Sequence, residues 1–153
     1  MTRDDLEELG EDLYREYLLD HYKNPRNAGV LEPADIDFEG DNPACGDRIR
    51  VTARLDDAGR ITDIKFQGTG CAISQASASI LYEEVIGKAT DDVLQLDRAK
   101  IEELTGITLR PSRVKCGVLG LHSLKHGIHA LRGAPARDQK SLPGFKTRGN
   151  DSA

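Results

Sequence analysis

The stretch RIRVTARLDDAGRITDIKFQ, residues 48–67, decides the fold. Apolar and polar side chains alternate on both sides of the DDAG turn signal at 56–59, so the stretch predicts two antiparallel strands joined by a hairpin. A third strand is predicted upstream, where Ile36 and Phe38 alternate with acidic residues. Because each strand has one polar face, we expect the sheet to be covered on one side only.

The other periodic segments predict helices. Apolar residues recur at helical spacing over 5–22, and Asn24-Pro25 ends this pattern. Further helices are expected over 72–86, 91–95, 97–105 and 117–132. The sequence therefore predicts an α+β fold, with a small antiparallel three-stranded sheet and helices packed on one face. We expect one domain over 1–132 and a flexible tail over 133–153, where periodicity is absent.

Composition narrows the function classes. The chain has 153 residues, with 21 Lys+Arg against 26 Asp+Glu and a net charge of −5. This acidic balance argues against a general nucleic-acid binder. The apolar runs are shorter than the roughly 20 residues that span a bilayer, and the N-terminus lacks a signal-peptide core. We expect no membrane partner and a cytoplasmic location, where thiols stay reduced.

Three cysteines are an odd count for disulfides, which favours metal binding or thiol chemistry. Each lies at an element boundary marked by Gly or Pro: Cys45 in DNPACGD (41–47), Cys71 in GTGCAIS (68–74) and Cys116 after PSRVK (111–115). The Cys-x-Asp spacing lets Cys45 and Asp47 present a thiolate and a carboxylate to one ion. Glycines before Cys71 permit a tight turn, and the helix that follows directs N–H groups toward its sulfur.

Three thiolates and one carboxylate are a four-coordinate set that suits Zn²⁺ or the iron of an Fe–S cluster. The spacing alone leaves open that the cysteines are buried and inert, because no pair forms a compact CxxC motif. Lys115 and Arg113 add positive charge beside Cys116. Lys115 either supports the thiolates or lies in solvent, and Arg113 either pairs with Asp47 or is a surface charge.

Two other sets of residues invite a functional interpretation, and we favour a structural one for both. His122, His126 and His129 have a spacing that could make a second metal site, but they border the apolar stripe of their helix, so we expect a boundary or solvated face. Tyr14, Tyr17 and Tyr22 are interpreted as core and edge packing.

Several stretches together resemble the U-type iron–sulfur assembly proteins, the IscU/SufU/NifU N-terminal family. They cover about residues 9–132 and are LYR (13–15), DHYKNPRN (20–27), NPACGD (42–47), GTGCAIS (68–74), ASAS (76–79) and RVKC (113–116). The resemblance implies a SufE/IscU-like fold in which three cysteines and one aspartate converge at one end. It implies Cys45, Asp47, Cys71 and Cys116 as ligands of zinc, iron or a nascent [2Fe–2S] cluster.

The resemblance also implies partners. Sulfur would come from a cysteine desulfurase of the SufS/IscS type, with Cys45 as persulfide acceptor and the N-terminal helix as a candidate desulfurase contact. Downstream Fe–S carriers or apo-proteins would receive the cluster. The resemblance combines features of two branches of the family. Lys115, where IscU proteins have histidine, is similar to SufU, but the usual SufU insertion between the second and third cysteines is missing.

Three functions stay open at this point. The first is a scaffold or sulfur carrier that accepts sulfur and builds a cluster. The second is a zinc-dependent sulfurtransferase that activates the desulfurase without building a cluster, which would make the chain an enzyme. The third is a structural zinc-binding domain, which is disfavoured because such sites usually close with Cys and His alone.

Overall fold

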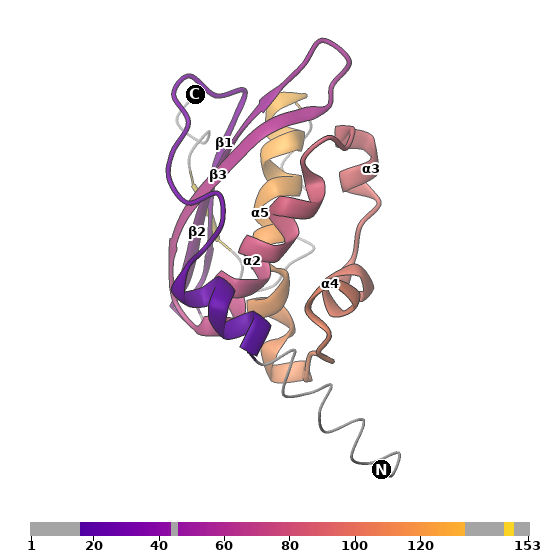
Figure 1. The fold of residues 1–153 in the computed structure, drawn as a ribbon. Coiled ribbons are helices and arrows are strands. Elements are labelled where there is room, and N and C mark those ends of the chain that lie inside the picture. Colours follow the sequence, from indigo (N-terminus) through magenta and orange to yellow (C-terminus); the bar gives the residue numbers. More distant parts are fainter. Residues whose placement is uncertain (1–15, 44–45, 134–145, 149–153) are drawn as a thin grey trace.

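The computed structural model describes residues 16–43, 46–133 and 146–148 (Figure 1). Its centre is an antiparallel sheet with the strand order β3-β2-β1-β4. The three predicted strands are present as β1 (Ile36–Asn42), β2 (Asp47–Leu55) and β3 (Ile61–Thr69). The α+β fold is therefore confirmed, and β2 and β3 form the hairpin that the DDAG signal predicts.

The fourth strand corrects the expectation of three. Strand β4 (Lys146–Arg148) pairs antiparallel with β1, where Glu39 lies opposite Arg148. A strand of three residues is too short to show an alternating pattern, so nothing in its sequence distinguishes it from the predicted tail. Most of that tail lies outside the described residues.

Helices α2 (Ala72–Val85) and α5 (Val114–Leu131) cover one face of the sheet, and α3 (Thr90–Leu94) and α4 (Arg98–Thr105) lie on the outer side of α2 (Figure 1). A short 3-10 turn, Pro111–Arg113, leads into α5. Helix α5 thus begins three residues earlier than the sequence predicts. The N-terminal helix is described over 16–23, and the start expected for it lies outside the described residues.

Small residues let the two central helices approach closely. A Cβ atom added at Gly120 of α5 would lie 2.9 Å from the Cβ of Ala78 in α2. That distance is shorter than real Cβ contacts allow, so glycine is needed at this crossing. The hydroxyl of Tyr82 donates a hydrogen bond to the Gly120 carbonyl at 2.8 Å, which satisfies the phenol inside the core.

The inner face of the sheet changes from apolar in the middle to polar at one end. In the middle, Phe38 faces Val51 across β1 and β2, and both side chains are buried. At the end of the same face the opposed pair is Asn42 and Asp47, each only 1% exposed. This end lies where α2 and α5 both begin (Figure 1). The fold therefore places two polar side chains beneath two helix N-termini.

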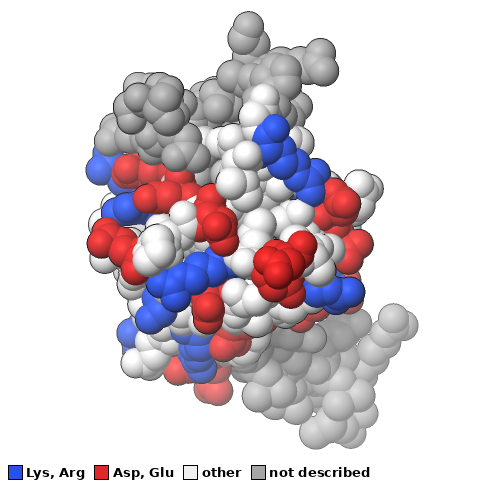
Figure 2. All heavy atoms as spheres, turned by 90° about the horizontal axis from the view of Figure 1, so that it is seen from above, with Lys and Arg blue, Asp and Glu red and all other residues white. Residues whose placement is uncertain are grey.

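The described surface carries mixed charge. Seen from above, acidic and basic side chains are interspersed, so this face presents neither sign alone (Figure 2). No helix in the described part of the chain is long and apolar enough to cross a bilayer.

Candidate metal centre

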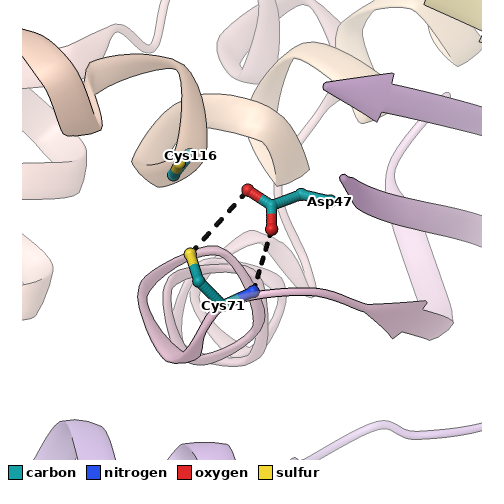
Figure 3. A group of neighbouring side chains, drawn as sticks. All are labelled: Asp47, Cys71 and Cys116. Carbon is teal, nitrogen blue, oxygen red and sulfur yellow. Dashed lines mark hydrogen bonds between the residues drawn. The ribbon is translucent and has the colours of Figure 1, made fainter. Parts of the chain in front are cut away.

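Three of the four sequence-predicted ligands converge at this end of the sheet. One ligand atom each from Asp47, Cys71 and Cys116 lies within 4.8 Å of the others. They come from the first residue of β2, the residue before α2 and the first turn of α5 (Figure 3). Among the described residues, no other group of three Cys, His, Asp or Glu ligand atoms comes together in this way.

Asp47 is held by one carboxylate oxygen. Its Oδ1 accepts a hydrogen bond from the backbone N–H of Cys71 at 2.8 Å, and its Oδ2 lies 3.7 Å from the Cys71 sulfur (Figure 3). No cation pairs with this buried carboxylate among the described residues. One oxygen is thus fixed to the backbone, while the other faces a sulfur.

The contact between Asp47 and Cys71 requires glycine at position 70. Gly70 has a φ of +135°, in a region that side chains rarely adopt. A Cβ atom added there would lie 2.2 Å from Oδ1 of Asp47. The sequence expectation of a glycine turn before Cys71 is therefore confirmed at Gly70, and its purpose includes room for the carboxylate.

Cys71 is the N-cap of α2. Its sulfur accepts a hydrogen bond from the backbone N–H of Ser74 at 3.5 Å, and the Ser74 hydroxyl donates to the Cys71 carbonyl at 3.0 Å. The Cys71 sulfur therefore caps the first turn of α2 and also lies against Oδ2 of Asp47. The side-chain amide of Gln75 donates to the carbonyl of Thr69 and to Ser74, which ties the end of β3 to the helix start.

Cys116 is fully buried in the first turn of α5. Its sulfur accepts a hydrogen bond from Nδ2 of Asn42 at 3.8 Å. Sequence reasoning missed Asn42 as a site residue. The signal was available, because Asn42 continues the alternation of Ile36 and Phe38 and so had to point to the inner face.

The remaining predicted site residues have separate outcomes. Cys45 lies outside the described residues, in the turn between β1 and β2. Lys115 and Arg113 are both exposed. A cleft of about 290 Å³ lined by Asn42, Asp47 and Thr69 opens beside the turn.

The expectation of a boundary or solvated face for the histidines is wrong for His126, which is buried and contacts Phe38 edge-to-face. Its helix lies deeper against β1 than the apolar stripe alone suggests. His122 is half-buried, and burial together with Lys125 lowers its pKa to about 4. A low pKa keeps the ring neutral, as the packed interior requires.

The tyrosine prediction is also partly wrong. Tyr17 and Tyr22 are 39% and 43% exposed, and Tyr14 lies outside the described residues. The N-terminal helix is attached instead through His21, whose Nδ1 lies 2.7 Å from the Ser79 hydroxyl of α2. Tyr17 and Tyr22 therefore lie at the surface of the helix that docks on α2.

The donors of Asp47 and Cys71 are spaced like two ligands of a tetrahedral metal, and the Cys116 sulfur lies within 4.8 Å of both. Thiolate and carboxylate ligands of Zn²⁺ lie about 2.0–2.3 Å from the ion, which puts two ligand atoms about 3.3–3.8 Å apart. The 3.7 Å between Asp47 Oδ2 and the Cys71 sulfur falls in that range. Two sulfurs and one oxygen leave a fourth position for another thiolate.

The model of the NifU-like N-terminal domain matches residues 13–138. The chain belongs to this family. It is 39% identical over 133 residues to the zinc-dependent sulfurtransferase SufU of Bacillus subtilis, covering 76% of this chain and 89% of the relative. It is 34% identical over 135 residues to the iron–sulfur cluster assembly scaffold protein IscU of Thermotoga maritima, covering 78% and 94%.

Solved structures agree with this assignment. The crystal structure of a SufU protein from Fervidobacterium islandicum superposes with a TM-score of 0.63 at 30% identity, covering 74% of this chain and 94% of that one. A NifU-like N-terminal domain from Brucella abortus gives a TM-score of 0.65 at 22% identity, covering 82% and 98%, and shows the shared fold. The chain is thus a member of the iron–sulfur cluster assembly scaffold family.

Proposed function

We propose that this protein accepts sulfur from a cysteine desulfurase and binds a metal or nascent [2Fe–2S] cluster at Cys45, Asp47, Cys71 and Cys116. The observation that carries the proposal is the convergence of Asp47, Cys71 and Cys116 from three separate segments. The 3.7 Å between Asp47 Oδ2 and the Cys71 sulfur also matches the spacing of two ligands on one ion, and the chain belongs to the NifU-like N-terminal domain family.

Cys45 is the proposed sulfur acceptor, because it matches the SufU acceptor and lies two positions before Asp47. Its thiolate would attack the outer sulfur of the desulfurase persulfide. A new sulfur–sulfur bond forms at Cys45, and the desulfurase cysteine leaves as a thiolate, so charge and electrons balance. The inner-face position of Asp47 would keep the loaded turn next to Cys71.

Asp47 suits a site that releases what it binds. A carboxylate is a harder and weaker ligand than thiolate for soft metals. Oδ1 accepts from the Cys71 N–H and Oδ2 accepts from the Cys71 thiol, so an ion bound at Oδ2 would take the place of the thiol proton. The hydrogen bond to Oδ1 would hold the carboxylate in place after the ion has left.

A zinc-dependent sulfurtransferase is the second candidate. It is supported by the 39% identity to the protein of that name and by Lys115 before the third cysteine. In that case Zn²⁺ would stay on the site and organise the thiolates without oxidising the sulfur.

The proposed partners follow from the same function. A cysteine desulfurase would contact the N-terminal helix, where Tyr17 and Tyr22 are exposed. Iron–sulfur carriers or apo-proteins would take up the product.

Metal analysis of protein purified without oxygen, followed by addition of iron, cysteine and a desulfurase, tests the proposal. A [2Fe–2S] absorption spectrum supports the scaffold. One tightly bound zinc, no cluster and faster desulfurase turnover support the sulfurtransferase. Absence of both metal and sulfur uptake would refute the proposed function.

Two variants separate the roles within the site. Cys45→Ser should abolish sulfur acceptance, and retained stimulation of the desulfurase would move that role to Cys71 or Cys116. Asp47→Ala should release zinc from a sulfurtransferase or make a cluster more persistent on a scaffold. Asp47→Asn is the matched control, because it keeps an acceptor for the Cys71 N–H while removing the charged ligand oxygen. If Asp47→Ala changed neither behaviour, Asp47 would not be a ligand.

A further inference from the structure

Asn42 is the last residue of β1, three positions before Cys45 in the sequence. It ends β1 and faces Asp47, which begins β2, so the two side chains share the inner face. Asp47 contacts Cys71 and Asn42 contacts Cys116. This cross-strand pair therefore connects the turn to the cysteines on both helices.

The nitrogen and the oxygen of the Asn42 side-chain amide differ in their hydrogen bonding. Its Nδ2 donates to the Cys116 sulfur at 3.8 Å, whereas its buried Oδ1 has no hydrogen-bond partner among the described residues. A buried acceptor without a partner lowers stability, and an apolar side chain of the same shape would avoid that cost. Folding alone therefore does not account for an amide at this position.

A metal-bound thiolate carries no proton and can only accept hydrogen bonds. The N–H end of the amide, which faces Cys116, is the end that such a sulfur requires. Hydrogen bonds to ligand sulfurs reduce the charge they donate and help to set metal affinity and cluster potential.

We propose that Asn42 is a positioning residue for the metal site, holding the Cys116 sulfur in place and moderating its donation to a bound ion. This inference rests on the proposed function, because it assumes that Cys116 is a ligand. It adds a residue outside the ligand set whose role is to order the Cys116 sulfur for a bound ion.

The test variant is Asn42→Leu, which preserves the branched shape and removes both polar ends. Without metal, the variant should melt at or above the wild-type temperature, because the unpartnered Oδ1 is gone. Loaded with Co²⁺, it should bind roughly 10–100-fold more weakly in chelator competition. Its sulfur-to-cobalt charge-transfer band should move to lower energy, because the sulfur has lost its hydrogen bond.

The matched control is Ser123→Ala. Ser123 lies on α5 two turns beyond Cys116, and its buried Oγ also has no partner among the described residues. This control should leave both Co²⁺ affinity and the charge-transfer band unchanged. Asn42→Ala provides the same readouts if the leucine variant does not fold.

The possible outcomes separate a failure of the proposed function from a failure of the role of Asn42 alone. Wild-type protein that shows no thiolate–cobalt band overturns the proposed function and this inference together. A wild-type band with unchanged affinity and energy in the Asn42 variants overturns this inference alone. Loss of stability and affinity in parallel, with an unmoved band, would mean that Asn42 only supports the fold.

Discussion

The middle and the end of the inner sheet face follow the same alternation but serve different purposes. In the middle, Phe38 and Val51 form a buried apolar pair under α5. Two inner-face pairs further along the strands, past Gly40 and Ile49, the residues are Asn42 and Asp47. The register is continuous across both places, so the residue types there decide whether the buried pair is apolar or polar.

The difference shows how a small domain can carry a polar site inside its core. The apolar middle supplies the stability that offsets burial of polar groups at the end. Of the buried polar pair at the end, Asp47 accepts from the N–H of Cys71 at the start of α2, whereas Oδ1 of Asn42 has no partner among the described residues. We therefore expect substitutions in the middle to change stability and substitutions at the end to change binding.

The largest expected effect on stability comes from a substitution in the apolar middle of the inner sheet face. Phe38→Ala removes a buried ring that contacts His126 and lies against Gly127. The free energy of unfolding should fall by about 3–5 kcal/mol, measured by urea denaturation. Metal bound per folded molecule should stay at the wild-type level, and its selective loss would show that the two regions are not separable.

The next largest effect is expected from a substitution at the polar end of the inner sheet face. Gly70→Ala should lower the free energy of unfolding by about 1–3 kcal/mol because of its φ. It should also weaken metal binding, because the new Cβ displaces Asp47. Gly87→Ala is the matched control: its φ is +89°, yet nothing lies within 4 Å of an added Cβ. Equal metal affinity in the two variants would contradict the displacement of Asp47.

A pH titration of stability tests whether the packed interior around α5 disfavours a charged histidine. The pKa of His122 is lowered from 6.5 to about 4 in the folded state, so the unfolded chain binds the extra proton first. Stability should be complete above pH 6.5 and fall by about 1–2 kcal/mol as pH drops toward 4, after discounting for partial solvent contact.

The control for the titration is His122→Gln, which should flatten this part of the stability profile. Burial also lowers the pKa of His21, so a residual decline in the same direction is expected. An unchanged slope in His122→Gln would assign the whole effect to His21 or other groups.

The smallest effect concerns the outer face of the same strands. Asp37 accepts two hydrogen bonds from the Arg50 guanidinium, at 2.9 and 2.7 Å, in a partly exposed position. Asp37→Asn should cost only about 0.2–1 kcal/mol, and the loss should shrink in high salt. A loss comparable to that of Phe38→Ala would mean that the outer face supports the fold as much as the core does.

Much of the fold could be predicted from local patterns. Alternation around Phe38 and across residues 48–67 located three strands, because a half-buried sheet imposes a period of two. Strand β4 could not be predicted, since its pairing with β1 is long-range and only three residues long. The start of α5 was misplaced because Val114 and Lys115 precede its apolar stripe.

The candidate site was predictable in its members but not in its connections. Cys71 and Asp47 were identifiable from glycine context and spacing, yet their hydrogen bond depends on how β2 meets the start of α2. The role of Asn42 was missed for the same reason, because its partner Cys116 is 74 positions away. The burial of His126 likewise follows from how α5 lies on β1.

The sequence by itself determined the α+β class, the strands, the main helices and the residue types available for a metal site. These depend on local backbone preference and on the periodicity of apolar side chains, which are written along the chain. Only the tertiary structure decided that Asp47 meets Cys71 and that Asn42 meets Cys116. Those contacts join residues distant in sequence, and they form only where packing of the apolar core brings the ends of two strands under two helix starts.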